Sequence, residues 1–209
     1  ETTTKTGLES LDALNGVGLQ SEEIAWITGS DVNFCAQAFP TVGYDHPDAP
    51  ILTVLGAVLR NGFLHSAIRE KGGAYGSGAQ QDSASRSFRF FSYRDPNCKE
   101  TFCAFNSSIE WSLKSINSEK LEEGILGVIS SIDKPGSPAG EARADFNQNI
   151  RGVDQAKRKR FRSRVIDCSV ERLVEVSQKY LTGIPKRAVI SGKQFEKEIN
   201  NLGFSVHNV

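Results

Sequence analysis

The sequence of 209 residues contains no methionine, only three histidines and no long apolar run. The lack of methionine fits a piece of a longer protein. No apolar run approaches the roughly 20 residues that would cross a bilayer, and the polar, threonine-rich start is unlike a secretory signal. We therefore expect a soluble chain that does not enter a membrane, in the cytoplasm of a bacterium or in an organelle matrix of a eukaryote.

The few histidines do not form a metal-binding motif. None has a second histidine or a glutamate at the spacing that brings two ligands to one helical face. The four cysteines are also scattered, and a domain of this size does not need disulfides. We expect no metal ligand in this chain and four reduced thiols, with a single disulfide as the lesser alternative. These residues are His46, His65 and His207, and Cys35, Cys98, Cys103 and Cys168.

Motifs for covalent or phosphate chemistry are missing as well. There is no Gly-x-Ser-x-Gly elbow, and Gly76-Ser77-Gly78 lacks the lysine and the following helix of a phosphate loop. The 25 basic and 25 acidic residues cancel, so no global charge attracts nucleic acid. The basic run Lys157 to Arg164 could bind phosphate backbones, but without stacking aromatics it is more typical of a solvated helix face. Nucleic-acid binding is therefore a minor alternative, and we expect none.

Periodicity divides the chain into an entry segment and one folded domain. Residues 1–23 are polar and punctuated by glycine, which is typical of a linker, so the domain is predicted over residues 24–209. A strand is predicted over Val32–Phe39, closed by Pro40. After Asp48, apolar residues recur at three- and four-residue intervals as far as Ile68, which predicts a long helix that ends at two glycines.

The remaining elements complete an α+β pattern. Two extended segments, Tyr75–Ser77 and Ser85–Arg94, predict a hairpin with Phe88 and Phe90 on one face. Helix starts are predicted at Asp95-Pro96-Asn97, at Ser118, at Ser137-Pro138 and at Ser169, and a last main strand at Arg187–Ser191. Because strands and helices do not alternate regularly and nothing repeats, we predict an α+β fold with a largely antiparallel sheet and helices packed on one face.

One segment carries side chains suited to chemistry. Arg69 lies in the last turn of the long helix, Gly72 and Gly73 allow a tight reversal, and Tyr75 then begins a strand. A guanidinium offers a rigid set of donors and a phenol one more, so the pair could grip peptide carbonyls and stabilise an oxyanion. From the residues alone, a plain helix end followed by a strand is the stronger interpretation.

Several strings in a fixed order carry a specific resemblance. They are His46-Pro47-Asp48-Ala49-Pro50, Asn61-Gly62-Phe63-Leu64, Arg69-Glu70-Lys71-Gly72-Gly73-Ala74-Tyr75-Gly76, Arg94-Asp95-Pro96-Asn97, Ser130-Ser131-Ile132-Asp133-Lys134-Pro135 and Ser137-Pro138-Ala139-Gly140. From about residue 24 onward the chain resembles the C-terminal domain of the presequence-protease branch of the insulinase/pitrilysin family of zinc metallopeptidases.

The resemblance implies a fold and a division of labour. Members have four homologous α+β domains, of the pitrilysin/processing-peptidase type, which form two halves of a closed chamber. The first domain binds zinc through His-x-x-Glu-His, in which glutamate activates the zinc-bound water. The last domain supplies an arginine and a tyrosine that match Arg69 and Tyr75, implied to be catalytic and to bind substrate together with Gly72 and Gly73.

The His-x-x-Glu-His motif is absent from this sequence. The resemblance therefore implies that zinc belongs to the parent protein and that this chain binds none and is inactive alone. Its implied partners are an unstructured peptide substrate and the N-terminal domains of the same polypeptide. The alternative function is a noncatalytic scaffold or partner-binding domain of the same fold, in a parent that has lost its zinc ligands.

Overall fold

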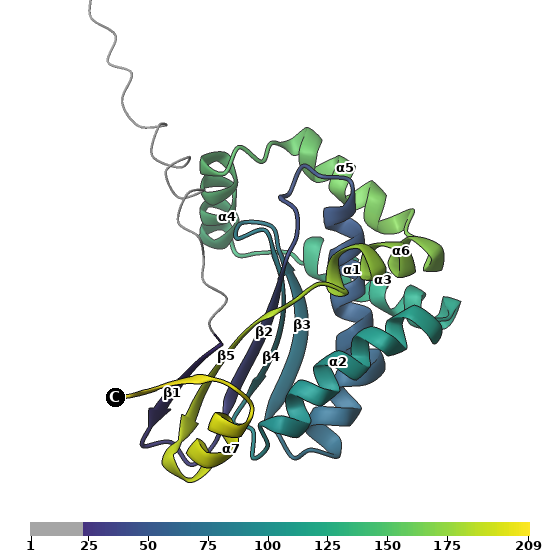
Figure 1. The fold of residues 1–209 in the computed structure, drawn as a ribbon. Coiled ribbons are helices and arrows are strands. Elements are labelled where there is room, and N and C mark those ends of the chain that lie inside the picture. The colour runs from purple at the N-terminus through teal and green to yellow at the C-terminus, as the bar shows by residue number, and fades with distance from the viewer. Residues whose placement is uncertain (1–22) are drawn as a thin grey trace, which may run out of the picture.

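The computed structural model describes residues 23–209, and its core element is one six-stranded mixed sheet (Figure 1). The strand order is β3-β4-β2-β5-β1-β6, in which β1 runs parallel to β5 and β6 and all other neighbours are antiparallel. The strands are β1 (Ile24–Thr28), β2 (Phe34–Pro40), β3 (Gly76–Asp82), β4 (Ser87–Tyr93), β5 (Lys186–Gly192) and β6 (Ser205–Asn208).

Helices cover one face of this sheet, as Figure 1 shows for α1, α2 and α6. Over residues 23–209 the helices are α1 (Asp48–Leu59), η2 (Arg60–Glu70), α2 (Lys99–Lys114), α3 (Ser118–Ile132), α4 (Pro138–Ile150), α5 (Gln155–Ile166), α6 (Val170–Leu181), the short η3 (Lys193–Phe195) and α7 (Glu196–Asn201). The predicted α+β class with helices packed on one face of a sheet is therefore confirmed.

The core lies between the sheet and α1, because alternate strand residues and the helical stripe face each other. Phe88 and Phe90 are fully buried, as the alternation predicted, and the ring of Phe90 packs against Phe39 and Phe105. The α1–η2 stretch Asp48–Glu70 is long and apolar enough to span a membrane, contrary to the expectation that no such run exists. Half of it is buried inside the protein, as expected of a core helix.

Several boundaries differ from the prediction for local reasons. Strand β1 was not predicted, and the predicted closing strand, β5, lies in the middle of the sheet because β1 and β6 add beyond it. The cap of α3 is Asn117, whose side chain accepts the Lys120 N–H, rather than Ser118. Cys98 precedes α2 without a side-chain cap, so the predicted cap at Asp95-Pro96-Asn97 is wrong. The predicted caps Ser137 and Ser169 are confirmed.

The second half of the long helix differs in kind. Arg60–Glu70 is a π-helix, in which each N–H bonds five residues back, as Lys71 does to the Ser66 carbonyl at 3.1 Å. Such segments are rare and cluster at functional sites. The predicted linker over residues 1–23 lies outside the described residues except for Glu23, whose carboxylate pairs with Arg187.

A buried hydroxyl pair joins α2 to α6. Ser112 and Ser177 are fully buried with their oxygens 2.6 Å apart, and the Ser112 hydroxyl also donates to the Ile109 carbonyl at 2.7 Å. We expect Ser112→Ala to lower the free energy of unfolding by about 1 kcal/mol, since it leaves the Ser177 hydroxyl without its partner. Urea denaturation measures this change. The double variant Ser112→Ala/Ser177→Ala should be closer to wild type than the single one, and a larger loss would contradict the pairing.

Candidate functional site

The reversal between η2 and β3 holds the predicted site residues. Gly73 has a φ of +79°, which only glycine adopts without strain. At Gly72 an added Cβ would lie 2.6 Å from the Ile68 carbonyl oxygen, so a side chain does not fit there either. Both glycines are therefore required by the geometry of the turn, which sets where Arg69 ends the helix and where Tyr75 enters the strand.

Hydrogen bonds fix this turn from within and from a neighbouring loop. The Gly73 N–H donates to the Arg69 carbonyl at 3.1 Å, which satisfies one of the free carbonyls at the helix end. From the loop before α2, the side-chain amide of Asn97 donates to the Gly72 carbonyl at 2.6 Å. The backbone that connects the two candidate residues is thus held in one conformation.

Tyr75 lies at the surface beside two side chains from β4 and its end. Its side chain is 65% exposed, its ring centroid lies 5.7 Å from that of Tyr93, and its N–H donates to the Arg94 carbonyl at 3.2 Å. The Arg94 guanidinium carbon lies 5.7 Å from the centre of the Tyr75 ring, within cation–π range. Arg94 has a φ of +49°, a conformation uncommon for residues other than glycine.

The structure brings the sequence-predicted residues Arg69, Gly72, Gly73 and Tyr75 into this one turn, with the side chains of Arg69 and Tyr75 both exposed. Neither side chain lines the large cavity described below. Arg94 was not predicted as a site residue. Its signal was present, because it opens the Arg94-Asp95-Pro96-Asn97 string, but only the pairing of β3 with β4 reveals that it reaches Tyr75.

The sheet face away from α1 and α2 carries exposed apolar side chains. Three of them lie opposite one another on neighbouring strands: Trp26 on β1, Ile190 on β5 and Phe34 on β2. Their exposed fractions are 45%, 47% and 38%, respectively. Tyr93 on β4 is exposed as well. We call Trp26, Phe34, Tyr93 and Ile190 the apolar sheet face. Clustered exposed apolar side chains mark surfaces that contact a ligand or another protein surface.

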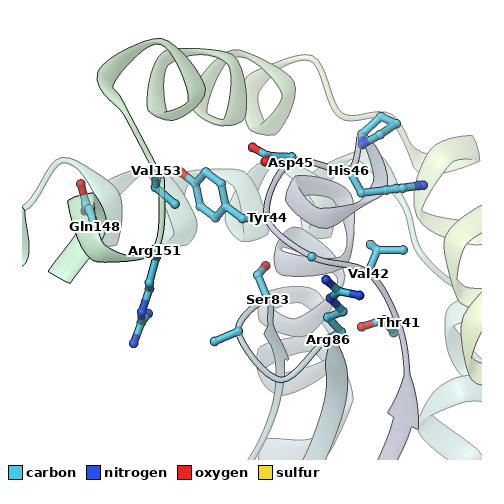
Figure 2. A pocket seen from close by; sticks show the side chains of 13 residues that line it. Thr41, Val42, Tyr44, Asp45, His46, Ser83, Arg86, Gln148, Arg151 and Val153 are labelled. Carbon is cyan, nitrogen blue, oxygen red and sulfur yellow. The ribbon is translucent and has the colours of Figure 1, made fainter. Parts of the chain in front are cut away.

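The large cavity lies elsewhere, at the other end of the β3–β4 hairpin from Tyr75. It has a volume of about 1010 Å³ and lies among the β2–α1 loop, the hairpin loop and the end of α4 (Figure 2). Burial raises the pKa of Tyr44 in its wall. Sequence reasoning did not find this cavity, because its three walls come from segments far apart in the chain.

The four cysteines are free thiols, three of them buried. A hydrogen bond with Cys98, together with burial, raises the pKa of Cys35, and burial raises the pKa of Cys168 to about 12. Because a thiolate is the reactive form, these two groups are protonated structural thiols. Among residues 23–209 no group of three or more histidine, cysteine, aspartate or glutamate side chains is placed to hold a metal ion.

Comparison with known proteins gives relatives in sequence and in structure. The profile of the family described as "PreP C-terminal domain" matches residues 28–187. The mitochondrial presequence protease of Danio rerio is 34% identical over 152 residues, which cover 72% of this chain but only 14% of that protein. The chain therefore spans a small part of the relatives that it matches.

Two solved structures share the fold. A protease from Helicobacter pylori matches with a TM-score of 0.69 at 17% identity. The match covers 81% of this chain and 43% of the protease chain. Pitrilysin matches with a TM-score of 0.62 at 16% identity. The match covers 90% of this chain and 22% of the pitrilysin chain. At this level of identity, the likeness extends to the fold alone.

Proposed function

Because the chain belongs to the family of presequence-protease C-terminal domains, we propose that it holds peptide substrate for a zinc-dependent endopeptidase and supplies Arg69 and Tyr75 to that enzyme's active site. The turn that joins these residues carries the proposal. It is fixed by Gly72, Gly73 and the Asn97 amide, and its two exposed side chains are of types that can donate hydrogen bonds.

The two side chains have separate roles in this proposal. The guanidinium of Arg69 donates to backbone carbonyls of the bound peptide and so fixes its position. The hydroxyl of Tyr75 donates to the carbonyl oxygen of the bond that is cut, where negative charge develops. Arg94, stacked against the Tyr75 ring, positions that ring and adds positive charge nearby.

The apolar sheet face gives the peptide's side chains a surface to contact. Trp26, Phe34 and Ile190 form a row across three strands, so an extended segment would meet apolar atoms along its length. Aromatic side chains are common at binding surfaces because they bury large areas at low entropic cost.

Zinc belongs to the part of the parent protein outside this chain. Residues 23–209 offer no set of side chains that fits the ion, so no step of the reaction is assigned to a metal here. Bound in the N-terminal part, zinc would supply the Lewis acid of a metallopeptidase. For the parent we propose an aqueous compartment, such as an organelle matrix or the cytoplasm. The Danio rerio relative is named as mitochondrial.

The role of Arg69 can be tested in the full-length parent protein. We expect Arg69→Gln to lower kcat/KM for a peptide about tenfold, mostly through KM, because it removes charge-assisted hydrogen bonds made to the bound peptide. The matched control is Lys71→Gln, an exposed cation two residues away that should leave both constants unchanged. Equal effects of the two variants would show that only local charge matters.

A noncatalytic scaffold is the second candidate, and the apolar sheet face is the observation that favours it. The same four side chains could pack against another domain of the polypeptide instead of a peptide. The sequence upstream of Glu1 discriminates between the two. An intact His-x-x-Glu-His supports the enzyme, and its loss supports the scaffold.

A further inference from the structure

The cavity at the hairpin end has walls that are tied to one another. The Thr41 N–H donates to the Arg86 carbonyl at 2.7 Å, which joins the β2–α1 loop to the β3–β4 hairpin. The Lys157 ammonium donates to Asp45 at 2.9 Å and to the Gly152 carbonyl at 2.8 Å, which joins the same loop to the segment after α4. The cavity is therefore a built feature of the fold rather than a gap between loose loops.

Two arginines line this cavity, Arg86 and Arg151. In the view of Figure 2, Arg86 and Arg151 lie on either side of Ser83. Among residues 23–209 neither guanidinium has a carboxylate within 4.0 Å. The one acidic side chain of the lining, Asp45, is already neutralised by Lys157. Within the described part of the chain, the lining therefore carries two positive charges that no carboxylate compensates.

The backbone conformation fixes the position of Arg86 in the cavity wall. Its φ is +52°, a value uncommon outside glycine, and such residues persist only where the surrounding structure fixes them. A Cβ added at Gly43 would lie 3.7 Å from the Arg86 Nε, so the guanidinium lies along the β2–α1 loop. Arg151 follows the last residue of α4, and its N–H donates to the Asn147 carbonyl at 3.2 Å.

The lining also presents an acceptor and a further donor. The side-chain oxygen of Gln148 is buried and has no hydrogen-bond partner among the described residues. A buried acceptor without a partner costs free energy until a donor reaches it. His46 accepts the Asp48 N–H at its Nδ1, 3.1 Å away, which leaves Nε2 as the ring nitrogen that can donate.

We propose that this cavity binds the carboxylate of a peptide segment, as a site separate from the turn at Tyr75. A carboxylate matches the donor fork of a single arginine, and Arg86 and Arg151 each offer one at separate places in the lining. The acceptor on Gln148 suits a backbone N–H of the same peptide segment, which a bare inorganic anion lacks. The volume of about 1010 Å³ is at the upper end of ligand pockets and admits several residues of chain. The carboxylate comes either from the C-terminus of the segment or from an aspartate or glutamate side chain.

Three labelled peptides test the proposal on this chain by fluorescence anisotropy. They are an alanine–glycine hexapeptide with a free C-terminus, the same peptide amidated, and the amidated peptide with one internal aspartate. We expect the free acid to bind about tenfold more tightly than the plain amide, the gain typical of a charge-assisted hydrogen bond. Equal binding of the aspartate peptide and the free acid assigns the site to carboxylates of either source, and tighter binding of one names the source.

Variants link the binding to the cavity. Of Arg86→Gln and Arg151→Gln, the variant at the arginine that holds the carboxylate should remove most of the difference between acid and amide. Arg143→Gln, which changes an exposed arginine on α4 outside the lining, should preserve the difference. Gln148→Met should weaken acid and amide equally, because its partner is a backbone N–H. Circular dichroism confirms folding, and Arg151, at a helix end, can be changed without touching the strained turn at Arg86.

Two results would overturn the proposal. One is equal affinity for the free acid and the plain amide. The other is an acid preference that survives in both Arg86→Gln and Arg151→Gln or that disappears equally in Arg143→Gln. Neither result bears on Arg69 and Tyr75, since those residues are tested by turnover in the parent protein.

Discussion

Replacing Tyr75 by phenylalanine in the full-length parent protein is expected to lower kcat for peptide hydrolysis about a hundredfold, the effect of one lost oxyanion donor. The ring remains, so its contacts with Tyr93 and Arg94 are kept and only the hydroxyl is removed. Because the proposed hydrogen bond strengthens as charge develops on the carbonyl oxygen, kcat should fall far more than KM changes. Steady-state kinetics on a fluorogenic peptide measures both.

A second tyrosine provides the matched control. The Tyr180 hydroxyl donates to Asp48 at 2.7 Å and lies on α6, outside the candidate site and the apolar sheet face. Tyr180→Phe should therefore lower stability while kcat stays at the wild-type value. A Tyr75→Phe enzyme that folds normally and turns over at the wild-type rate would remove the role assigned to the hydroxyl.

The fold could be predicted where local pattern and tertiary packing agree. The helix that starts at Asp48 has a wide apolar stripe, and the structure buries that stripe against the sheet. The alternation around Phe88 and Phe90 gave the correct faces of β4 for the same reason. Ser137 and Ser169 were recognisable because serine before a helical run satisfies a free N–H of the first turn.

Other features depend on partners distant in sequence. Strand β1 has only five residues, and its place follows from pairing with β5 and β6, more than 160 residues along the chain. Nothing in Arg60–Glu70 distinguishes a π-helix from an α-helix by periodicity alone, since apolar residues occur at mixed spacings. The cap of α3 moved by one residue because Asn117 and Ser118 are both good caps and only one can occupy the position.

The candidate site also combines features that the local sequence predicts with features that depend on distant segments. Gly72 and Gly73 predicted a reversal from composition, and the reason each must be glycine is a positive φ in one case and a carbonyl contact in the other. Arg94 and the hairpin cavity required the strand register and the packing of three remote segments. Family resemblance supplied the roles of Arg69 and Tyr75. Residue chemistry alone left two interpretations of this segment, a substrate-binding pair and a plain helix end followed by a strand.

Replacing Asp48 by asparagine is expected to lower the free energy of unfolding by roughly 1.5–3 kcal/mol, the typical worth of hydrogen bonds to a charged group. The Asp48 side chain is buried at the start of α1, where the helix dipole favours an anion. It accepts hydrogen bonds from Arg172 at 2.8 Å, Lys179 at 2.9 Å and Tyr180 at 2.7 Å, all on α6. Asparagine keeps the shape of the side chain but loses the negative charge that attracts these donors.

The pH dependence separates charge from packing in this prediction. Burial alone would raise the pKa of Asp48, but hydrogen bonds from Lys179 and Tyr180 outweigh it and hold the pKa below its usual value of 3.8. Since the folded pKa is lower than the unfolded one, the stabilisation is fully present above about pH 4 and is lost as the pH falls through the folded pKa. The gap between wild type and Asp48→Asn in urea denaturation should therefore narrow below pH 4. A gap that stays constant down to pH 2 would assign the stabilisation to packing of α1 on α6 rather than to the ionised carboxylate.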